Sequence, residues 1–132
     1  MLSDLLAEIV RQGHDDAVVD LDLFFDGNND DASIGPNLLD NPGPAAFHAI
    51  LRSIRDRSDV YGVWVAITEV MPEGEWPFTD RVYVVTSAPP DDVDRWVQEL
   101  QADEPGDASW FGQEPPPVAV PDDARIVVLW WD

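Results

Sequence analysis

The run of residues 60–70, VYGVWVAITEV, constrains the fold of this chain more than any other segment. It is rich in β-branched and aromatic side chains, is apolar on both faces and ends at Met71 and Pro72, which is typical of a β-strand. A second β-branched run occupies residues 81–86. The two runs therefore predict a β-hairpin with a long tip.

Three segments have the apolar spacing of an amphipathic helix, in which side chains at i, i+3, i+4 and i+7 share one face. The first covers residues 3–12 and ends before Gly13. The second covers 44–57 and the third begins at residues 89–90, and both open with proline, which is tolerated in a first helical turn. We expect each helix to place its apolar stripe on the core.

Two further strands are predicted, at residues 19–25 and 126–131. In the first, apolar residues at every second position alternate with Asp20, Asp22 and Phe24. A period of two places the two acids on the face of the strand that points away from the core. The segments between the predicted elements, 26–43 and 103–124, are rich in residues such as Asn, Asp, Gly and Pro that favour irregular loops.

The order of elements is α-β-α-β-β-α-β, and after the first helix it matches the split βαβ arrangement of ferredoxin-like domains. We therefore expect an α+β fold, with a four-stranded antiparallel sheet and helices packed on one face. Crossover connections would make strand one central and parallel to strand two. Residues 1–132 would form a single domain, with an N-terminal helix at 3–12 and a split βαβ core at 17–131.

The chain is strongly acidic: 132 residues contain 7 Arg, no Lys and 27 Asp plus Glu, for a net charge of −20. Such a chain repels phosphate backbones and anionic lipids, so we expect neither nucleic acid nor a membrane as a partner, and a basic protein is favoured. A high-GC genome or a halophilic cytosol would also produce this composition. Residues 1–13 lack the features of a secretory signal, which predicts a cytoplasmic protein.

Several kinds of chemistry are excluded by composition. No Cys is present, which excludes disulfides and Cys-based metal centres, and the absence of Lys excludes Schiff-base chemistry. Neither a phosphate-binding glycine loop nor a G-x-S-x-G elbow occurs. His14 and His48 have no spacing typical of a metal site or a triad, so we interpret them as surface or packed residues. The sequence thus predicts no cofactor and no enzymatic activity.

The predicted topology gathers three loops, 26–43, 71–79 and 103–124, at one end of the sheet. They contain 12 acids and no Arg: Asp26, Asp30, Asp31, Asp40, Glu73, Glu75, Asp103, Glu104, Asp107, Glu114, Asp122 and Asp123. They also contain the large aromatics Trp76, Phe78, Trp110 and Phe111. Acids that steer a basic partner and aromatics that anchor it are typical of a protein interface. Alternatively, the aromatics pack beneath their own loops.

Two smaller groups of acids allow other interpretations. Asp26, Asn28 and Asp30 have the D-x-N-x-D spacing that opens a calcium loop, but Gly at position 31 and an acid at position 37 are missing, so this metal site is a weak candidate. Asp20 and Asp22 could perform acid–base chemistry, could contribute to a second docking face on the sheet, or could simply face water. We favour the structural interpretation for both groups.

In size, composition and lack of catalytic motifs the chain resembles the immunity proteins of bacterial toxin systems. The resemblance implies that it neutralises a toxin by covering the active site, and many such proteins bind basic nucleases through acidic surfaces. Capture would then use the acids of 26–31, 73–75 and 103–107, with Trp76 or Trp110 as the anchor. The alternatives are an acidic housekeeping module that mimics nucleic-acid charge, or a small Asp-based enzyme or metal-ion binder.

Overall fold

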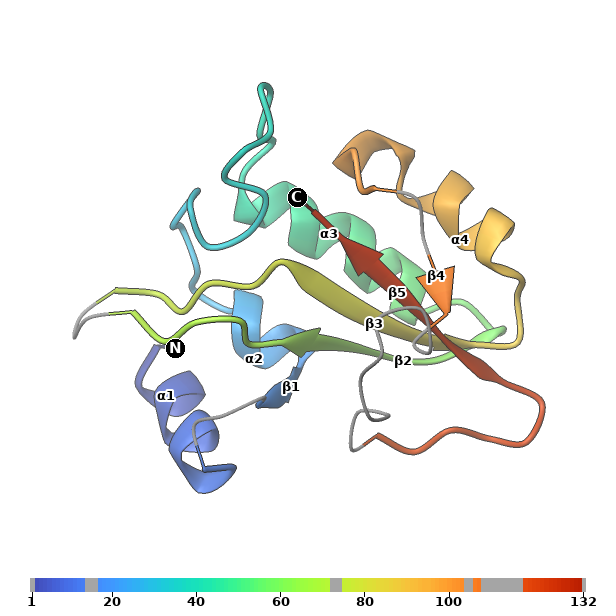
Figure 1. The fold of residues 1–132 in the computed structure, drawn as a ribbon, viewed down its shortest axis with the longest axis horizontal. Helices are drawn as coiled ribbons and strands as arrows, with labels where there is room; N and C mark the ends of the chain where they lie inside the picture. Colours follow the sequence, from blue (N-terminus) through green and yellow to red (C-terminus); the bar gives the residue numbers. More distant parts are fainter. Residues whose placement is uncertain (1, 14–16, 72–74, 104–105, 108–117, 132) are drawn as a thin grey trace.

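A computed structural model describes residues 2–13, 17–71, 75–103, 106–107 and 118–131 of the chain (Figure 1). The helices are α1 (Leu2–Arg11), α2 (Leu21–Phe25), α3 (Pro44–Arg55), α4 (Pro90–Trp96) and the 3-10 helix η1 (Gln98–Leu100). The strands are β1 (Val18–Asp20), β2 (Val60–Ala66), β3 (Arg81–Thr86), β4 (Gly106–Asp107) and β5 (Arg125–Trp130). The α+β class and the antiparallel sheet are thereby confirmed, and the order of elements roughly matches the prediction.

The strands are arranged in the order β1-β2-β3-β5-β4, and every neighbouring pair is antiparallel. The expectation that strand one is central and parallel to strand two was wrong, because β1 is an edge strand that runs antiparallel to β2. The physical reason is the path of the connection. Loop 26–43 reaches the end of the sheet where β2 gives way to the hairpin, and α3 then returns along the sheet, so the chain enters β2 in the opposite direction to β1.

The predicted strand 19–25 is cut short by a helix. Only Val18–Asp20 are extended, and the side chain of Asp20 accepts a hydrogen bond from the backbone N–H of Asp22 at 3.0 Å, which caps α2. Leu21, Phe24 and Phe25 are then buried together, at the i, i+3 and i+4 spacing of a helix. The apolar residues of this segment fit both the period of two of a strand and the period of 3.6 of a helix. The capping hydrogen bond of Asp20 favours the helix.

Helix α1 is tied to the edge of the sheet by Gln12. Its side-chain amide accepts from the N–H of Val18 at 3.0 Å and donates to the carbonyl of Val18 at 2.9 Å, as a neighbouring strand would. The same amide donates to Glu8, which also binds Arg11, and these hydrogen bonds lower the pKa of Glu8 from 4.5 to about 2, Arg11 contributing most. The edge that β1 would otherwise expose is therefore occupied by a side chain.

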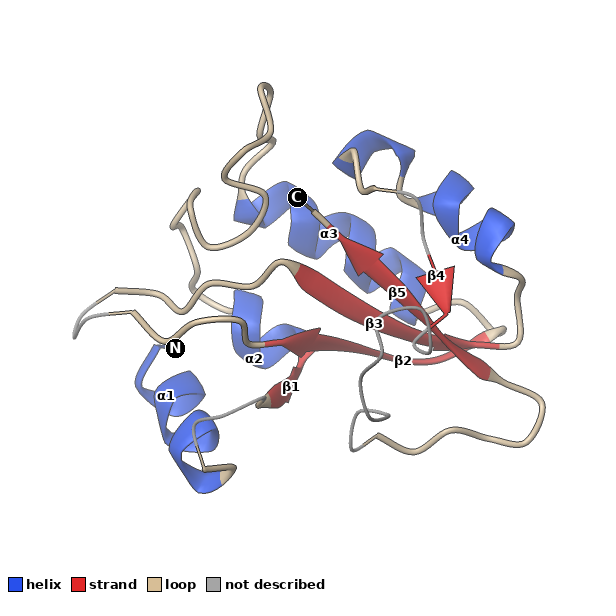
Figure 2. Ribbon diagram, in the orientation of Figure 1, coloured by secondary structure: helices blue, strands red, loops and turns tan. Residues whose placement is uncertain are grey.

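One core lies between the sheet and all four α-helices (Figure 2). Alternate strand residues such as Val65, Val84 and Leu129 meet Leu5 of α1, Phe47 of α3 and Val93 of α4. The expected packing of helices on one face agrees with this cluster. The opposite sheet face has a smaller apolar cluster, which consists of Val18, Ala66, Tyr83, Val85, Ile126 and Val128, with Trp64, Val118 and Ala124 packed against it.

Candidate functional site

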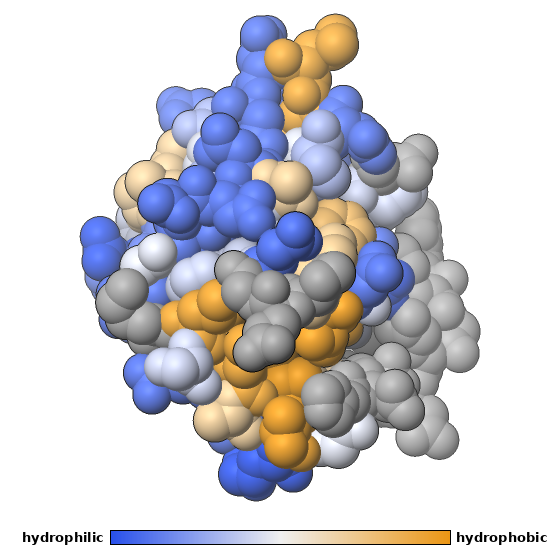
Figure 3. All heavy atoms as spheres, turned by 90° about the vertical axis from the view of Figure 1, so that its left-hand side faces the viewer, coloured by the Kyte–Doolittle hydropathy of each residue, from blue (hydrophilic) through white to orange (hydrophobic). Residues whose placement is uncertain are grey.

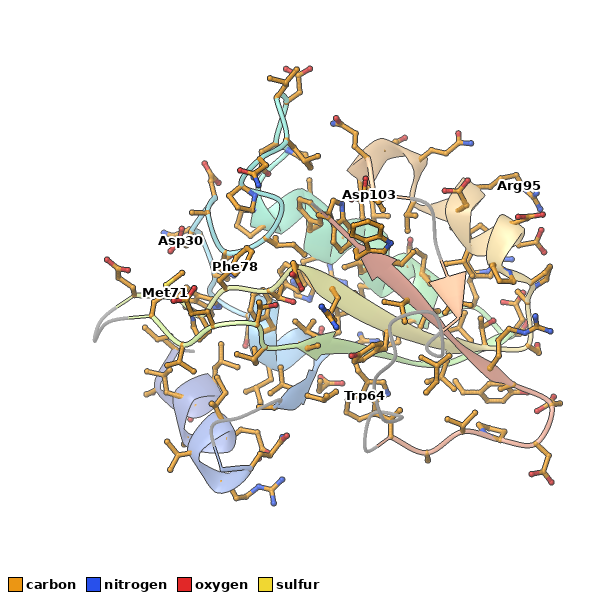
Figure 4. The ribbon with its side chains drawn as sticks, viewed as in Figure 1. Asp30, Trp64, Met71, Phe78, Arg95 and Asp103 are labelled. Carbon is orange, nitrogen blue, oxygen red and sulfur yellow. The ribbon has the colours of Figure 1, made fainter. Side chains whose placement is uncertain are left out.

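Two of the three predicted loops meet at the hairpin end of the sheet. Ile34 in loop 26–43 forms an isolated bridge with Thr79, and the N–H of Thr79 donates to the carbonyl of Ser33 at 2.9 Å. Beyond β2 the hairpin continues through a bridge between Glu69 and Phe78. Asp30, Met71 and Phe78 accordingly lie near one another on the left of Figure 4. Loop 26–43 and the hairpin are therefore in contact at this end, so the described acids of the two segments lie on neighbouring parts of the molecule.

Loop 26–43 is held by its own side chains. Asn28 is buried, and its amide donates to the hydroxyl of Ser33 at 2.9 Å while its carbonyl oxygen accepts from the N–H of Asp30 at 2.9 Å. The carboxylate of Asp30 in turn accepts from the N–H of Ala32. These turns use the oxygens of Asn28 and Asp30, two members of the weak metal candidate. Within the described residues, no group of three His, Asp or Glu side chains is placed to hold a metal ion.

The protruding part of this loop is fixed by Asn41. Its amide lies 2.8 Å from the carbonyl oxygen of Asp31, 3.2 Å from that of Ile34 and 3.1 Å from that of Gly35. Beyond this anchor the loop exposes Leu39 completely, at 101% of its reference area. The tip of the loop is therefore exposed, while the residues around Asn41 that support it are held by hydrogen bonds.

Four acids of these two loops are exposed and have no cationic partner among the described residues. Asp26, Asp31, Asp40 and Glu75 are all exposed, and within the described residues no ion pair includes any of them. Asp30 is half-buried. We name Asp26, Asp30, Asp31, Asp40 and Glu75 the acidic loop surface.

The third predicted loop does not stay at this end. Asp103 is half-buried, and its N–H donates at 2.9 Å to the carbonyl of Trp130, at the end of β5 that pairs with Arg81. Asp122 and Asp123 lie at the opposite end, where Asp123 accepts from the hydroxyl of Tyr61 at 2.8 Å. The gathering of all 12 acids at one end was therefore wrong, because β5 runs antiparallel to β3 and so enters the sheet at the end away from the hairpin. Asp107 lies in β4.

The predicted aromatic anchors have a different position from the one expected. Trp76 is only 8% exposed, and its indole N–H donates to the carbonyl of Phe24 at 2.8 Å, so it belongs to the core and cannot act as an exposed anchor. Phe78 is half-buried at its bridge with Glu69. Glu73, Glu104, Trp110, Phe111, Glu114 and His14 lie outside the described residues.

Asp22 forms the centre of a charged network between α2 and α3. Nε2 of His48 donates to one carboxylate oxygen of Asp22 at 2.8 Å, and the guanidinium of Arg55 donates to the other, also at 2.8 Å. The imidazole stacks on Phe25 with ring centroids 5.4 Å apart. The hydrogen bond from His48, followed by that from Arg55, lowers the pKa of Asp22, and Asp22 raises the pKa of Arg55.

This network replaces the predicted pair of carboxylates on the sheet. Asp20 caps α2 and Asp22 joins α2 to α3, so both have structural partners. Sequence reasoning missed the role of His48, although one signal was available. His48 and Arg55 are seven residues apart on the predicted helix 44–57 and therefore share a face. The imidazole of His48 therefore links α3 to α2, through its hydrogen bond to Asp22 and its stacking on Phe25.

Comparison with known proteins identifies the family of the chain. The model of the family described as "Uncharacterized protein YfbO family" matches residues 1–129. The chain belongs to the YfbO family. The protein YfbO of Escherichia coli K12 is 34% identical over 116 residues, which cover 87% of this chain and 82% of the E. coli protein. No solved structure matches the chain significantly. Among the described residues of this YfbO-family chain, no helix is long and apolar enough to cross a bilayer.

Proposed function

We propose that this YfbO-family chain is a binding protein that captures a basic protein through the acidic loop surface. The observation that carries this proposal is the exposure of Asp26, Asp31, Asp40 and Glu75 without cationic partners among the described residues. Unpaired acids on one surface raise the rate at which an oppositely charged partner associates. Five of the seven Arg side chains, by contrast, are already engaged with acids elsewhere: Arg11, Arg55, Arg57, Arg81 and Arg95.

The internal order of loop 26–43 supports the same function. The hydrogen bonds of Asn28 and Asn41 hold the loop before any partner arrives, so little conformational entropy is lost on binding. A basic protein whose own function is to bind phosphates would present a complementary surface. We therefore propose that the bound protein is a basic toxin, such as a nuclease, and that the chain acts as its immunity protein by covering the phosphate-binding site.

The test compares two variants of equal charge. One neutralises the acidic loop surface through Asp26→Asn, Asp31→Asn and Glu75→Gln, and the control neutralises exposed acids elsewhere through Asp94→Asn, Glu99→Gln and Asp122→Asn. Basic proteins that co-purify with the wild-type chain are isolated first, and the affinity of each variant for them is measured by calorimetry in low and in physiological salt. The enzymatic activity of these proteins is measured in parallel.

We expect the first variant to weaken binding by about tenfold or more in low salt and the control to change it by less than about threefold. The wild-type chain should inhibit the enzymatic activity of the bound protein, and the first variant should inhibit it less. Equal weakening by the two variants would show that only net charge matters, and binding without inhibition would refute the immunity role while leaving capture intact.

A further inference from the structure

Helix α1 carries a second apolar row that the core covers only in part, because Leu2 and Leu6 pack against it but stay partly exposed. Leu5 and Ile9 are fully buried, whereas Leu2 and Leu6 are half-buried and Val10 is 58% exposed. Leu2, Leu6 and Val10 follow one another at i, i+4 and i+8, so they form a continuous ridge along one side of the helix. With a rise of 1.5 Å per residue this ridge is about 12 Å long.

The ridge belongs to a larger apolar area. Val70 and Met71, in the hairpin arm that follows β2, are also only partly buried. Both α1 and this arm lie on the left-hand side of Figure 1, and Figure 3, which shows that side, contains an apolar area bordered by hydrophilic side chains. Glu69 and Glu75 are exposed on the hairpin, and Asp26 is exposed at the end of α2. We name Leu2, Leu6, Val10, Val70 and Met71 the α1 patch.

The charge of the chain selects the occupant of this patch. A second copy of this chain also has a net charge of −20, so the two copies would repel each other. An anionic membrane would be repelled for the same reason. A basic protein would be attracted, and the acids of the hairpin and of loop 26–43 would lie at the border of the contact. Apolar side chains at the centre and charges at the rim are the ordinary arrangement of a protein interface.

The shape of the patch indicates which element of that protein docks. A row of side chains at i±4 spacing on one helix packs into the groove between the corresponding rows of another helix. An amphipathic helix laid on an apolar surface is also a recurrent mode of recognition. We propose that the α1 patch docks a basic amphipathic helix of the partner. This inference rests on the proposed function, because it places the apolar anchor beside the acidic loop surface.

Two synthetic peptides of Leu and Lys provide the probe. In one the leucines occupy a single helical face, and in the other the same residues are scrambled so that no face is apolar. Binding of the labelled peptides to the full chain is measured by fluorescence anisotropy at physiological salt. The key variant is Val10→Ser, and its matched control is Val120→Ser, which changes an exposed valine (42%) in the segment before β5.

We expect the amphipathic peptide to bind about tenfold more tightly than the scrambled one, and Val10→Ser to remove most of that difference, because a buried valine contributes about this much. Val120→Ser should leave both affinities unchanged. The inference is overturned if the two peptides bind equally, if neither binds, or if the two serine variants behave alike.

The acid variant Asp26→Asn, Asp31→Asn and Glu75→Gln separates this inference from the proposed function. If it weakens both peptides while Val10→Ser has no effect, capture of a basic partner is supported and the α1 patch is not its anchor. If Val10→Ser weakens the amphipathic peptide while the acid variant changes neither affinity, the patch docks a helix and the acidic loop surface does not capture the partner.

Discussion

The two ends of the sheet differ in how their charged side chains are paired. At the end where α3 meets β2, Arg57 binds Asp59 at 3.0 Å and its guanidinium lies 3.9 Å from the ring centroid of Trp96. At the hairpin end, Asp26, Asp31, Asp40 and Glu75 are exposed and, within the described part of the chain, take part in no ion pair. The described residues at the first end thus combine an Arg–Asp pair with exposed acids such as Asp122, whereas the acidic loop surface at the hairpin end contains no paired acid.

The position of the unpaired acids determines where the charge can act. Exposed ion pairs stabilise a protein by at most about 1 kcal/mol, so the pairs at the β2 end mainly cancel the local field. Unpaired acids at the hairpin end leave a negative potential that extends over about a Debye length into solution. The hairpin end also rests on buried side chains. The exposed acids of the hairpin end are therefore available to bind a partner, while the buried side chains below them stabilise the fold.

Trp76→Ala should have the largest effect, because it removes a buried ring and its hydrogen bond to Phe24 from beneath the hairpin end. We expect the free energy of unfolding to fall by about 3–5 kcal/mol, measured by urea denaturation. Leu39→Ala, on the exposed tip of loop 26–43, is the control and should change it by less than about 0.5 kcal/mol. Similar effects of the two variants would show that the hairpin end has no buried base.

Asp22→Asn should have the next largest effect, since it weakens the hydrogen bonds to His48 and Arg55 that join α2 to α3. Asp22 is half-exposed, so we expect a loss of about 1–2 kcal/mol at neutral pH by chemical denaturation. Asp56→Asn, whose carboxylate lies 4.0 Å from the same guanidinium, is the control and should have little effect.

The Asp22 contribution should depend on pH in one direction. Because the folded state lowers the pKa of this carboxyl below its ordinary value of 3.8, its stabilising effect is fully present above that value. The effect is lost as the pH falls through the lowered pKa. Denaturation curves of wild type and Asp22→Asn should therefore converge in acid, and a difference that persists at the lowest pH would contradict the role of this carboxylate.

Arg57→Ala tests the ion pair at the end where α3 meets β2. It removes the ion pair with Asp59 and the contact with the Trp96 ring, and we expect a loss of about 0.5–1 kcal/mol. The control is Arg125→Ala, which changes the net charge by the same amount as Arg57→Ala. Arg125 is exposed and forms no ion pair within the described residues, so its removal should have a smaller effect. Equal losses would mean that only net charge is being measured.

Glu75→Gln tests an exposed acid of the hairpin end and should have the smallest effect. Removing one unpaired acid reduces repulsion, so stability should rise by up to about 0.5 kcal/mol in low salt and not change in high salt. Asp59→Asn at the other end should instead lower stability, since it breaks the pair with Arg57. Thermal unfolding of both variants in low and in high salt measures whether stability rises or falls. A loss of stability with Glu75→Gln would refute the distinction between the ends.

Patterns that repeat over a few residues were sufficient for much of the fold. Strand 81–86 and the start of α3 at Pro44 were predicted correctly, because alternation and a first-turn proline are local signals. Residues 21–25 were predicted wrongly, since their apolar side chains fit both a strand and a helix. Of the candidate site, the exposure of Asp26, Asp31 and Glu75 followed from composition, whereas the burial of Trp76 did not.

The α+β class, the main helices and strands, and the large excess of acid could be predicted before the structure was known, because each depends on local periodicity or on counting. Tertiary structure decided the strand order and the contacts between distant residues. His48 and Asp22 are 26 residues apart, and Trp76 and Phe24 are 52 apart. Such pairs meet only after the connection through α3 folds back along the sheet, and no pattern within a single element encodes that path.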